Sequence, residues 1–213
     1  MLKPITCLLL LSASLPCPAE QIVLQENRFE HIHFRRIQPT IIHFEQDTIH
    51  FDVKKSSSFL LLAFDEIKDI RTVAFEWQAE GMLNKSTASQ EKTRKGDDAW
   101  LRVGLVISGE PDLVPEPLLP RWVIKARDVL KHPSDRMLYL IPDARHPPGE
   151  TWRSPFSSNI DMVSVESRDG PDGWKQVKHE FDRPRSAVGL WLMADGDNTG
   201  SIFTSRLRKL RIE

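Results

Sequence analysis

Apolar residues recur at every second position through most of the chain after residue 47. In TIHFDV, for example, Ile49, Phe51 and Val53 alternate with polar residues. Successive side chains of a strand point to opposite faces, so this alternation is typical of a strand with one buried face. Similar runs occupy residues 58–64, 71–80, 99–107, 136–141, 160–167, 174–181, 187–193 and 201–212. Clusters of Gly, Pro, Asn and Asp separate these nine runs, which together predict an all-β fold.

One segment has a helical period instead. In PLLPRWVIKARDVLKHP the apolar residues recur at spacings of three and four, Pro120 suits a first helical turn, and Pro133 follows the last one. We expect one amphipathic helix over residues 120–131. Because strands and helices do not alternate, doubly wound α/β folds are excluded, and the pattern predicts an antiparallel β-sandwich or jelly roll with one inserted helix.

The N-terminus has the layout of a secretory signal peptide. A cation at Lys3 precedes an apolar stretch and a run of small residues, which predicts a signal over residues 1–19 with cleavage after Ala19. The apolar stretch is too short to span a bilayer, which needs about 20 residues. A lipid anchor on Cys17 is the alternative, although the proline before it stands where a small residue is preferred. We therefore expect a periplasmic or secreted protein.

Cysteine and charge narrow the class of protein further. Both cysteines lie inside the predicted signal, so residues 20–213 would form a single domain without a disulfide. The net charge of −1 argues against nucleic-acid binding, which needs a concentrated basic face. The one basic stretch, SRLRKLRIE, places its cations on both sides of a strand, so it predicts a charged, solvated edge strand.

Acidic residues gather at the ends of two predicted strands. Asp97 and Asp98 precede the strand that starts at residue 99, and Asp195, Asp197 and Asn198 follow the strand that ends at residue 193. If these ends are neighbours, their oxygens could bind calcium, with Asp195 and Asp197 as the metal ligands. The alternative, which we favour, is a turn in which Asp and Asn side chains cap their own backbone.

Tryptophans provide a second indication of function. Indole faces stack on sugar rings, but they also fill protein cores. Trp77 and Trp191 lie within alternating strands and are expected in the core. Trp152 and Trp174 lie at borders between loops and strands, and they are the better candidates for exposed saccharide contacts.

Five segments, in order, carry a resemblance to a known family. FEWQAEG, KGDDAWLRVGLVI, YLIP, GWKQVKHEF and AVGLWLMADGDNTGS resemble the bacterial family named domain of unknown function 3047, over about residues 51–212. The resemblance implies an exported jelly-roll protein, similar in outline to carbohydrate-binding or galactose-binding-like domains, and it implies no particular activity. This chain departs from the family in the segment 111–131 and in Gly196, where the family pattern has threonine.

Three classes of function follow. The first is a noncatalytic exported domain that binds a saccharide or another envelope ligand. The second is a glycan-active hydrolase or lyase, which would need two carboxyl groups about 5–9.5 Å apart. The third is a structural or interaction protein of the envelope. Calcium is the one cofactor considered. The candidate ligand-binding residues are Trp152, Trp174, Glu76, Asp97, Asp98, Asp195, Asp197 and Asn198.

Overall fold

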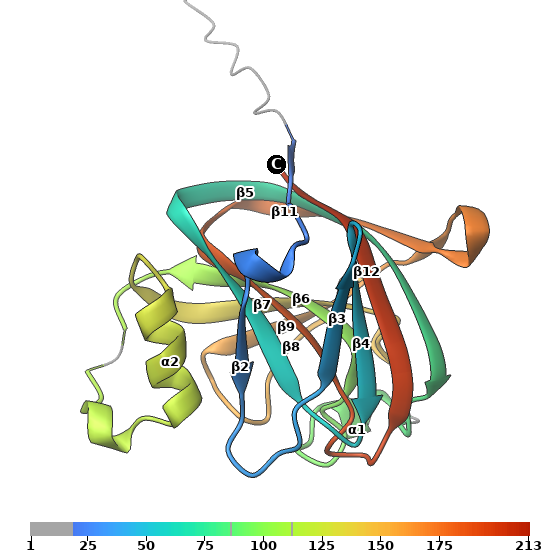
Figure 1. Cartoon of the computed structure of the whole chain (residues 1–213), viewed down its shortest axis with the longest axis horizontal. Helices are drawn as coiled ribbons and strands as arrows, with labels where there is room; N and C mark the ends of the chain where they lie inside the picture. Colours follow the sequence, from blue (N-terminus) through green and yellow to red (C-terminus); the bar gives the residue numbers. More distant parts are fainter. Residues whose placement is uncertain (1–18, 86, 112) are drawn as a thin grey trace, which may run out of the picture.

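The computed structural model describes residues 19–85, 87–111 and 113–213, and the predicted signal peptide with Cys17 lies outside this part of the chain. Strands dominate the described residues (Figure 1). They are β1 (Glu20–Gln21), β2 (Glu30–His33), β3 (Ile41–Glu45), β4 (Thr48–Lys54), β5 (Ser58–Met82), β6 (Ala99–Ser108), β7 (Ser134–Pro142), β8 (Thr151–Arg153), β9 (Ile160–Val165), β10 (Arg168–Asp169), β11 (Lys175–Asp195) and β12 (Ile202–Ile212). The α-helices are α1 (Ala88–Glu91) and α2 (Arg121–Val129), and 3-10 turns span Glu26–Arg28, Glu116–Leu118 and Pro171–Gly173.

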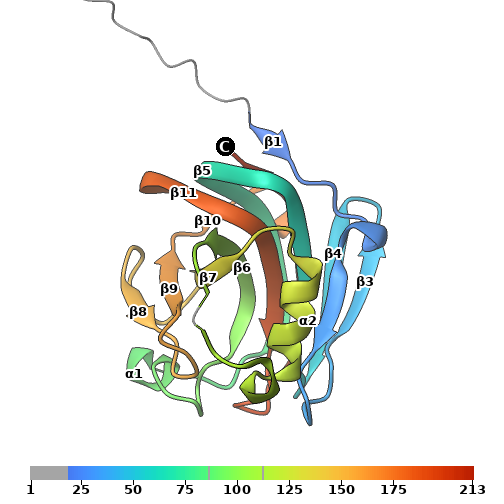
Figure 2. The ribbon, with the colours of Figure 1, turned by 90° about the vertical axis from the view of Figure 1, so that its left-hand side faces the viewer.

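Two long strands, β5 and β11, connect two layers of sheet. They pair antiparallel, from Phe59 opposite Met193 to Trp77 opposite Lys175, with an irregular stretch between Glu180 and Arg185. The first layer contains β2, the first half of β5, the second half of β11, and then β6, β7, β9 and β8. The second layer contains β3, β4, β12 and the remaining halves of β5 and β11. Figures 1 and 2 show both long strands curving from one layer into the other.

The core lies between these layers and uses the alternating residues predicted from the sequence. Leu62, Leu105 and Leu190 of the first layer and Phe51 and Trp77 of the second belong to one buried cluster. Burial of each such side chain stabilises the fold by about 1.5–3 kcal/mol. The prediction of an all-β sandwich is confirmed. One pair of strands, β7 and β9, is parallel, which alternation alone does not reveal.

Helix α2 confirms the predicted helix, and it covers the outer face of the first layer (Figure 2). Ala126 is buried, and Trp122 and Leu130 pack against a second apolar cluster that includes Phe59 and Trp191. The face of β5 and β11 that points away from the main core is therefore not solvated. No helix in the described part of the chain is long and apolar enough to cross a bilayer.

The C-terminal strand differs from its prediction. β12 is not an edge strand, because it lies between β4 and β5. Lys209 has a positive φ of 51°, and the register with β5 shifts there. This bulge interrupts the alternation, so Leu207 and Leu210 are both buried. It also brings the cations of Arg208 and Lys209 to the carboxylate of Glu76, at 2.7 and 3.0 Å.

Candidate functional site

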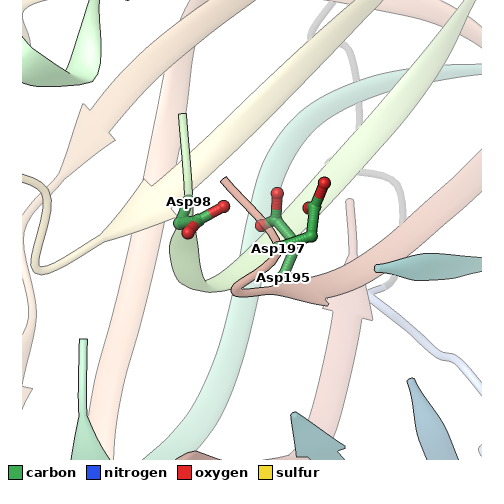
Figure 3. Close-up of side chains that lie close together, drawn as sticks. All are labelled: Asp98, Asp195 and Asp197. Carbon is green, nitrogen blue, oxygen red and sulfur yellow. The ribbon is translucent and has the colours of Figure 1, made fainter. Parts of the chain in front are cut away.

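The two acidic strand ends meet at one end of the first layer. β11 pairs with β6 so that Asp195 lies opposite Ala99, which places the acids before β6 beside those after β11. One carboxylate oxygen each from Asp98, Asp195 and Asp197 lies within 4.8 Å of the others (Figure 3). The two strand ends are thus neighbours, which was the condition for a shared site.

Arg102 is the buried cation of this cluster. It extends from β6, and its Nη2 donates to the carbonyl oxygen of Asp97 at 2.9 Å and to the carboxylate of Asp97 at 3.0 Å. Its Nη1 lies 3.3 Å from the carboxylate of Asp195. Sequence analysis missed this role, although Arg102 is the one charged residue of the apolar run AWLRVGLVI.

Burial sets the protonation of this cluster. It raises the pKa of Asp195 well above the ordinary value and raises the pKa of Asp97, while Arg102 opposes both shifts. Against the lowering effect of burial, the charges of Asp195 and Asp97 raise the pKa of Arg102. Arg102 therefore stays cationic, and one guanidinium serves two carboxyl groups.

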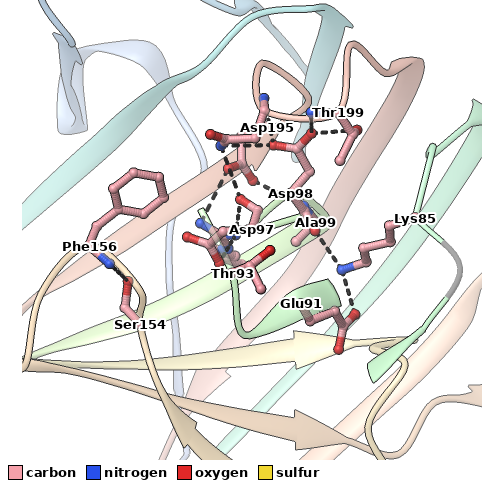
Figure 4. A network of polar contacts seen from close by, with 12 residues as sticks. Lys85, Glu91, Thr93, Asp97, Asp98, Ala99, Ser154, Phe156, Asp195 and Thr199 are labelled. Carbon is pink, nitrogen blue, oxygen red and sulfur yellow. Dashed lines mark hydrogen bonds and ion pairs between the residues drawn. The ribbon is translucent and has the colours of Figure 1, made fainter. Parts of the chain in front are cut away.

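Asp98 holds the turn that follows β11. One of its oxygens accepts from the backbone N–H and the side-chain amide of Asn198, both at 3.2 Å. The other accepts from the backbone N–H of Thr199 at 2.7 Å and from its hydroxyl at 2.6 Å (Figure 4). Gly200 completes the turn with a φ of 68°. The turn is therefore capped by Asp98, at the start of β6. The prediction that acidic side chains of the turn cap its own backbone was wrong for the N–H groups of Asn198 and Thr199.

This bonding favours the turn over calcium. Asp98 already accepts four hydrogen bonds, which uses about all the lone-pair sites of a carboxylate. Asp195 accepts from the backbone N–H of Ala99 at 3.2 Å and faces Arg102 with its other oxygen. Of the two metal ligands predicted from the sequence, only Asp197 has a carboxylate that no such hydrogen bond or ion pair occupies.

Asp197 is half-buried and lies at the open side of the cluster. Its strongest side-chain contact is a long one, 3.4 Å from the amide of Asn198. Burial raises the pKa of Asp197, and the neighbouring charge of Asp98 adds to that shift. The turn thus does not depend on this carboxylate.

A pocket of about 270 Å³ opens beside Asp197 on the outer face of the first layer. Its polar end is formed by Asp97, Arg102, Asp195, Asp197 and Asn198, and its walls include Phe34, Trp122, Tyr139, Phe156, Trp191 and Met193. The ring of Trp122 stands edge-on to those of Phe34 and Trp191, with centroids 5.8 Å apart in each pair. The pocket therefore joins aromatic walls to an acidic end.

Two N–H groups of the pocket-lining residues lack an acceptor. Nε1 of Trp191 and Nε of Arg102 are buried and have no hydrogen-bond partner among the described residues. The side chains that carry them are almost fully buried, with Trp191 3% and Arg102 4% exposed. Buried donors usually have partners, so these two N–H groups are exceptions among the described residues.

Trp152 and Trp174, the two candidates for exposed saccharide contacts, both pack back on the protein instead. Trp152 is 8% exposed and stacks on His146, with centroids 4.1 Å apart. Trp174 is 9% exposed, and the guanidinium of Arg208 lies 3.9 Å from its ring centroid. The core positions expected for Trp77 and Trp191 are confirmed.

Glu76 is also separate from the acidic cluster. It lies on the second layer, where Arg208, Lys209 and Gln176 bind its carboxylate. Against the raising effect of burial, the bonds from Lys209 and Arg208 lower the pKa of Glu76. The structure therefore brings together Asp97, Asp98, Asp195, Asp197 and Asn198, and it places Glu76 and Trp174 elsewhere.

A second buried ion pair, between Lys85 and Glu91, lies next to the acidic cluster. Nζ of Lys85 lies 2.5 Å from Glu91 and donates to the carbonyl oxygen of Asp98 at 2.5 Å (Figure 4). Burial lowers the pKa of Lys85, against the attraction of Glu91. These residues, like Trp122 and Phe34, carried no distinctive signal in the sequence.

Comparison with known proteins relates the chain to one family. No curated protein matches the chain. Among solved structures, a mutant of CBM29-2, a family 29 carbohydrate-binding module, is similar to 92% of this chain over 92% of its own, with 9% sequence identity and a TM-score of 0.39. The profile of the family described as "Protein of unknown function (DUF3047)" matches residues 27–211. Because this match covers most of the chain, the protein belongs to the DUF3047 family.

Proposed function

We propose that this protein is an exported, noncatalytic domain that binds a saccharide of the cell envelope in the pocket beside Asp197. One observation carries the proposal, namely that aromatic walls and polar groups converge on a single pocket. A sugar ring has apolar C–H faces that stack on aromatic rings and hydroxyl groups that bond to carboxylates and amides. The volume of about 270 Å³ is close to the smallest typical ligand sites, of about 300 Å³, and suits a single sugar ring.

The ion pairs and hydrogen bonds of the acidic residues support saccharide binding rather than saccharide hydrolysis. A glycosidase needs two carboxyl groups that are free to exchange protons or attack the sugar. Arg102 engages Asp97 and Asp195, and the turn engages Asp98. Only Asp197 remains, so the pocket has one free carboxyl group among the described residues.

Export is the part of the proposal that rests on the signal-like residues 1–19. Mass spectrometry of the protein from a cell-envelope extract should find Glu20 at its N-terminus. A lipid on Cys17 would instead make the protein a tethered one, and an intact Met1 would contradict export.

Binding is tested with a glycan array and then by titration calorimetry with each bound sugar, in calcium and in EDTA. We expect Phe156→Ala and Trp122→Ala each to weaken binding about tenfold, because an aromatic stacking contact contributes about 0.5–1.5 kcal/mol. Phe156 is 50% exposed, so its truncation should leave folding intact. Met82→Ala, which removes an apolar side chain 64% exposed at the end of β5, is the matched control.

Three results would count against the proposal. Binding that is unchanged in both pocket variants would place the saccharide elsewhere. Release of shorter glycans during the titration would indicate a hydrolase or lyase. A protein that binds no glycan at all would favour a structural or interaction role.

A further inference from the structure

The charges that line the pocket do not balance. Three carboxyl groups, from Asp97, Asp195 and Asp197, share the pocket with one guanidinium, that of Arg102. Arg102 lies within ion-pair distance of Asp97 and Asp195. No ion pair of Asp197 occurs among the described residues, so its charge has no protein counterpart there.

The carboxylate of Asp197 is not needed to hold the turn in which it lies. The backbone of the turn is held by Asp98, whose oxygens reach Asn198 and Thr199 at 2.6–3.2 Å. Asp197 nevertheless places a half-buried carboxylate next to Asp98, where like charges repel. A cation in the pocket would relieve this repulsion.

Other groups in the pocket limit what the cation can be. The unpartnered N–H groups of Trp191 and Arg102 call for oxygen acceptors, such as hydroxyl groups. The faces of Trp122 and Phe156 suit both C–H groups and cations. A ligand that meets these requirements carries a positive charge, several oxygens and a compact ring.

We propose that the pocket binds an amino sugar with a free amino group, held in its ammonium form between Asp197 and the aromatic walls. This inference rests on the proposed saccharide-binding function and specifies its ligand class. A neutral sugar leaves the carboxylate of Asp197 without a counter-charge. An N-acetylated sugar does the same, because its nitrogen is an uncharged amide.

The test compares D-glucosamine, N-acetyl-D-glucosamine and D-glucose at pH 7 by titration calorimetry of the mature chain. We expect roughly tenfold tighter binding of glucosamine than of either neutral sugar, as for an ion pair partly shielded from water. Chitosan and chitin oligomers, tested in the same way, distinguish a free sugar from one residue of a polysaccharide. Tight binding of the chitosan oligomer with weak binding of glucosamine would indicate the polymer.

Variants of Asp197 decide whether this carboxylate selects the amine. Asp197→Asn should remove the preference, so that glucosamine and glucose bind equally, whereas Asp197→Glu should retain the preference. Asp47→Asn, an exposed residue of the turn between β3 and β4, is the matched control and should change nothing. The melting temperature of each variant confirms that it is folded.

The pH profile gives an independent measurement. As pH falls through the raised pKa of Asp197, its carboxyl group gains a proton and the preference for glucosamine should disappear. Asp97 and Asp195 face the same region, where Arg102 and, at Asp97, Lys85 oppose the effect of burial on their pKa values. Protonation of either acid removes negative charge from the pocket and so acts in the same direction.

Two of the remaining outcomes overturn the amino-sugar inference alone, and the last overturns both proposals. Equal affinity for all three sugars would overturn the amino-sugar inference and leave saccharide binding intact. Unchanged selectivity in Asp197→Asn would also overturn it. Binding of choline without binding of any sugar, or no binding at all, would overturn both proposals.

Discussion

Arg102→Met is expected to lower the free energy of unfolding by about 3–5 kcal/mol, because removing one partner of a buried ion pair leaves the other uncompensated. Here two carboxyl groups, those of Asp97 and Asp195, lose their shared guanidinium. Asp97 and Asp195 are at most 5% exposed, so water cannot take the place of the guanidinium. Urea unfolding monitored by tryptophan fluorescence measures the change.

The loss of stability in Arg102→Met should depend on pH, and the direction of this dependence follows from the pKa values of Asp97 and Asp195. Without Arg102 the folded-state pKa values of Asp97 and Asp195 lie still further above the ordinary 3.8. A carboxyl group with a raised folded-state pKa stabilises the fold fully below its unfolded pKa, and this stabilisation is lost as pH rises through the folded pKa. The deficit of Arg102→Met relative to wild type should therefore be smaller at pH 5 than at pH 8.

A combined variant serves as the control. Adding Asp97→Asn and Asp195→Asn to Arg102→Met removes the unpaired charges, so it should recover part of the loss and remove its pH dependence. A deficit that is the same at every pH, and that the added substitutions do not change, would show that Arg102 acts through packing alone.

Asp98→Ala is expected to cost about 3 kcal/mol, since it leaves two backbone N–H groups without their acceptor, at roughly 1–3 kcal/mol for each. The N–H groups belong to Asn198 and Thr199. Urea unfolding again measures the loss. Because the turn positions Asp197 and Asn198, saccharide binding should weaken as well.

The matched comparison for Asp98→Ala is Asp197→Ala in the same turn. Asp197 contacts the amide of Asn198 at 3.4 Å and bonds otherwise to its own backbone, so we expect a loss of about 1 kcal/mol. Equal losses in the two variants would contradict the view that the turn is held from β6. Asp98→Asn, which keeps one oxygen acceptor, should fall between them.

The strands were the most predictable part of the fold. Alternation located β4, the start of β6 and the end of β11, whereas the meeting of those two strand ends was only a condition that the sequence left open. The order of the strands in the sheet was harder to predict from the sequence. β12 looks like a charged edge strand until the bulge at Lys209 and the partner Glu76 are known, and both depend on contacts far away in the sequence.

The candidate site was predicted only in its acidic half. The acids form a visible pattern, whereas the walls of the pocket come from five distant segments that contribute Phe34, Trp122, Tyr139, Phe156 and Trp191. Trp152 and Trp174 attracted attention because loop borders are often exposed. His146 and Arg208 cover them instead, and neither neighbour can be identified from local sequence.

Strands β5 and β11 also determine how the molecule can fold. Residues 187–212 supply the strand that joins β5 to β6 in one layer and the strand that joins β4 to β5 in the other. Neither layer can close before this last segment arrives, and such long-range pairing is characteristic of proteins that fold in milliseconds to seconds. We therefore expect that neither layer persists as a folded intermediate without residues 187–212.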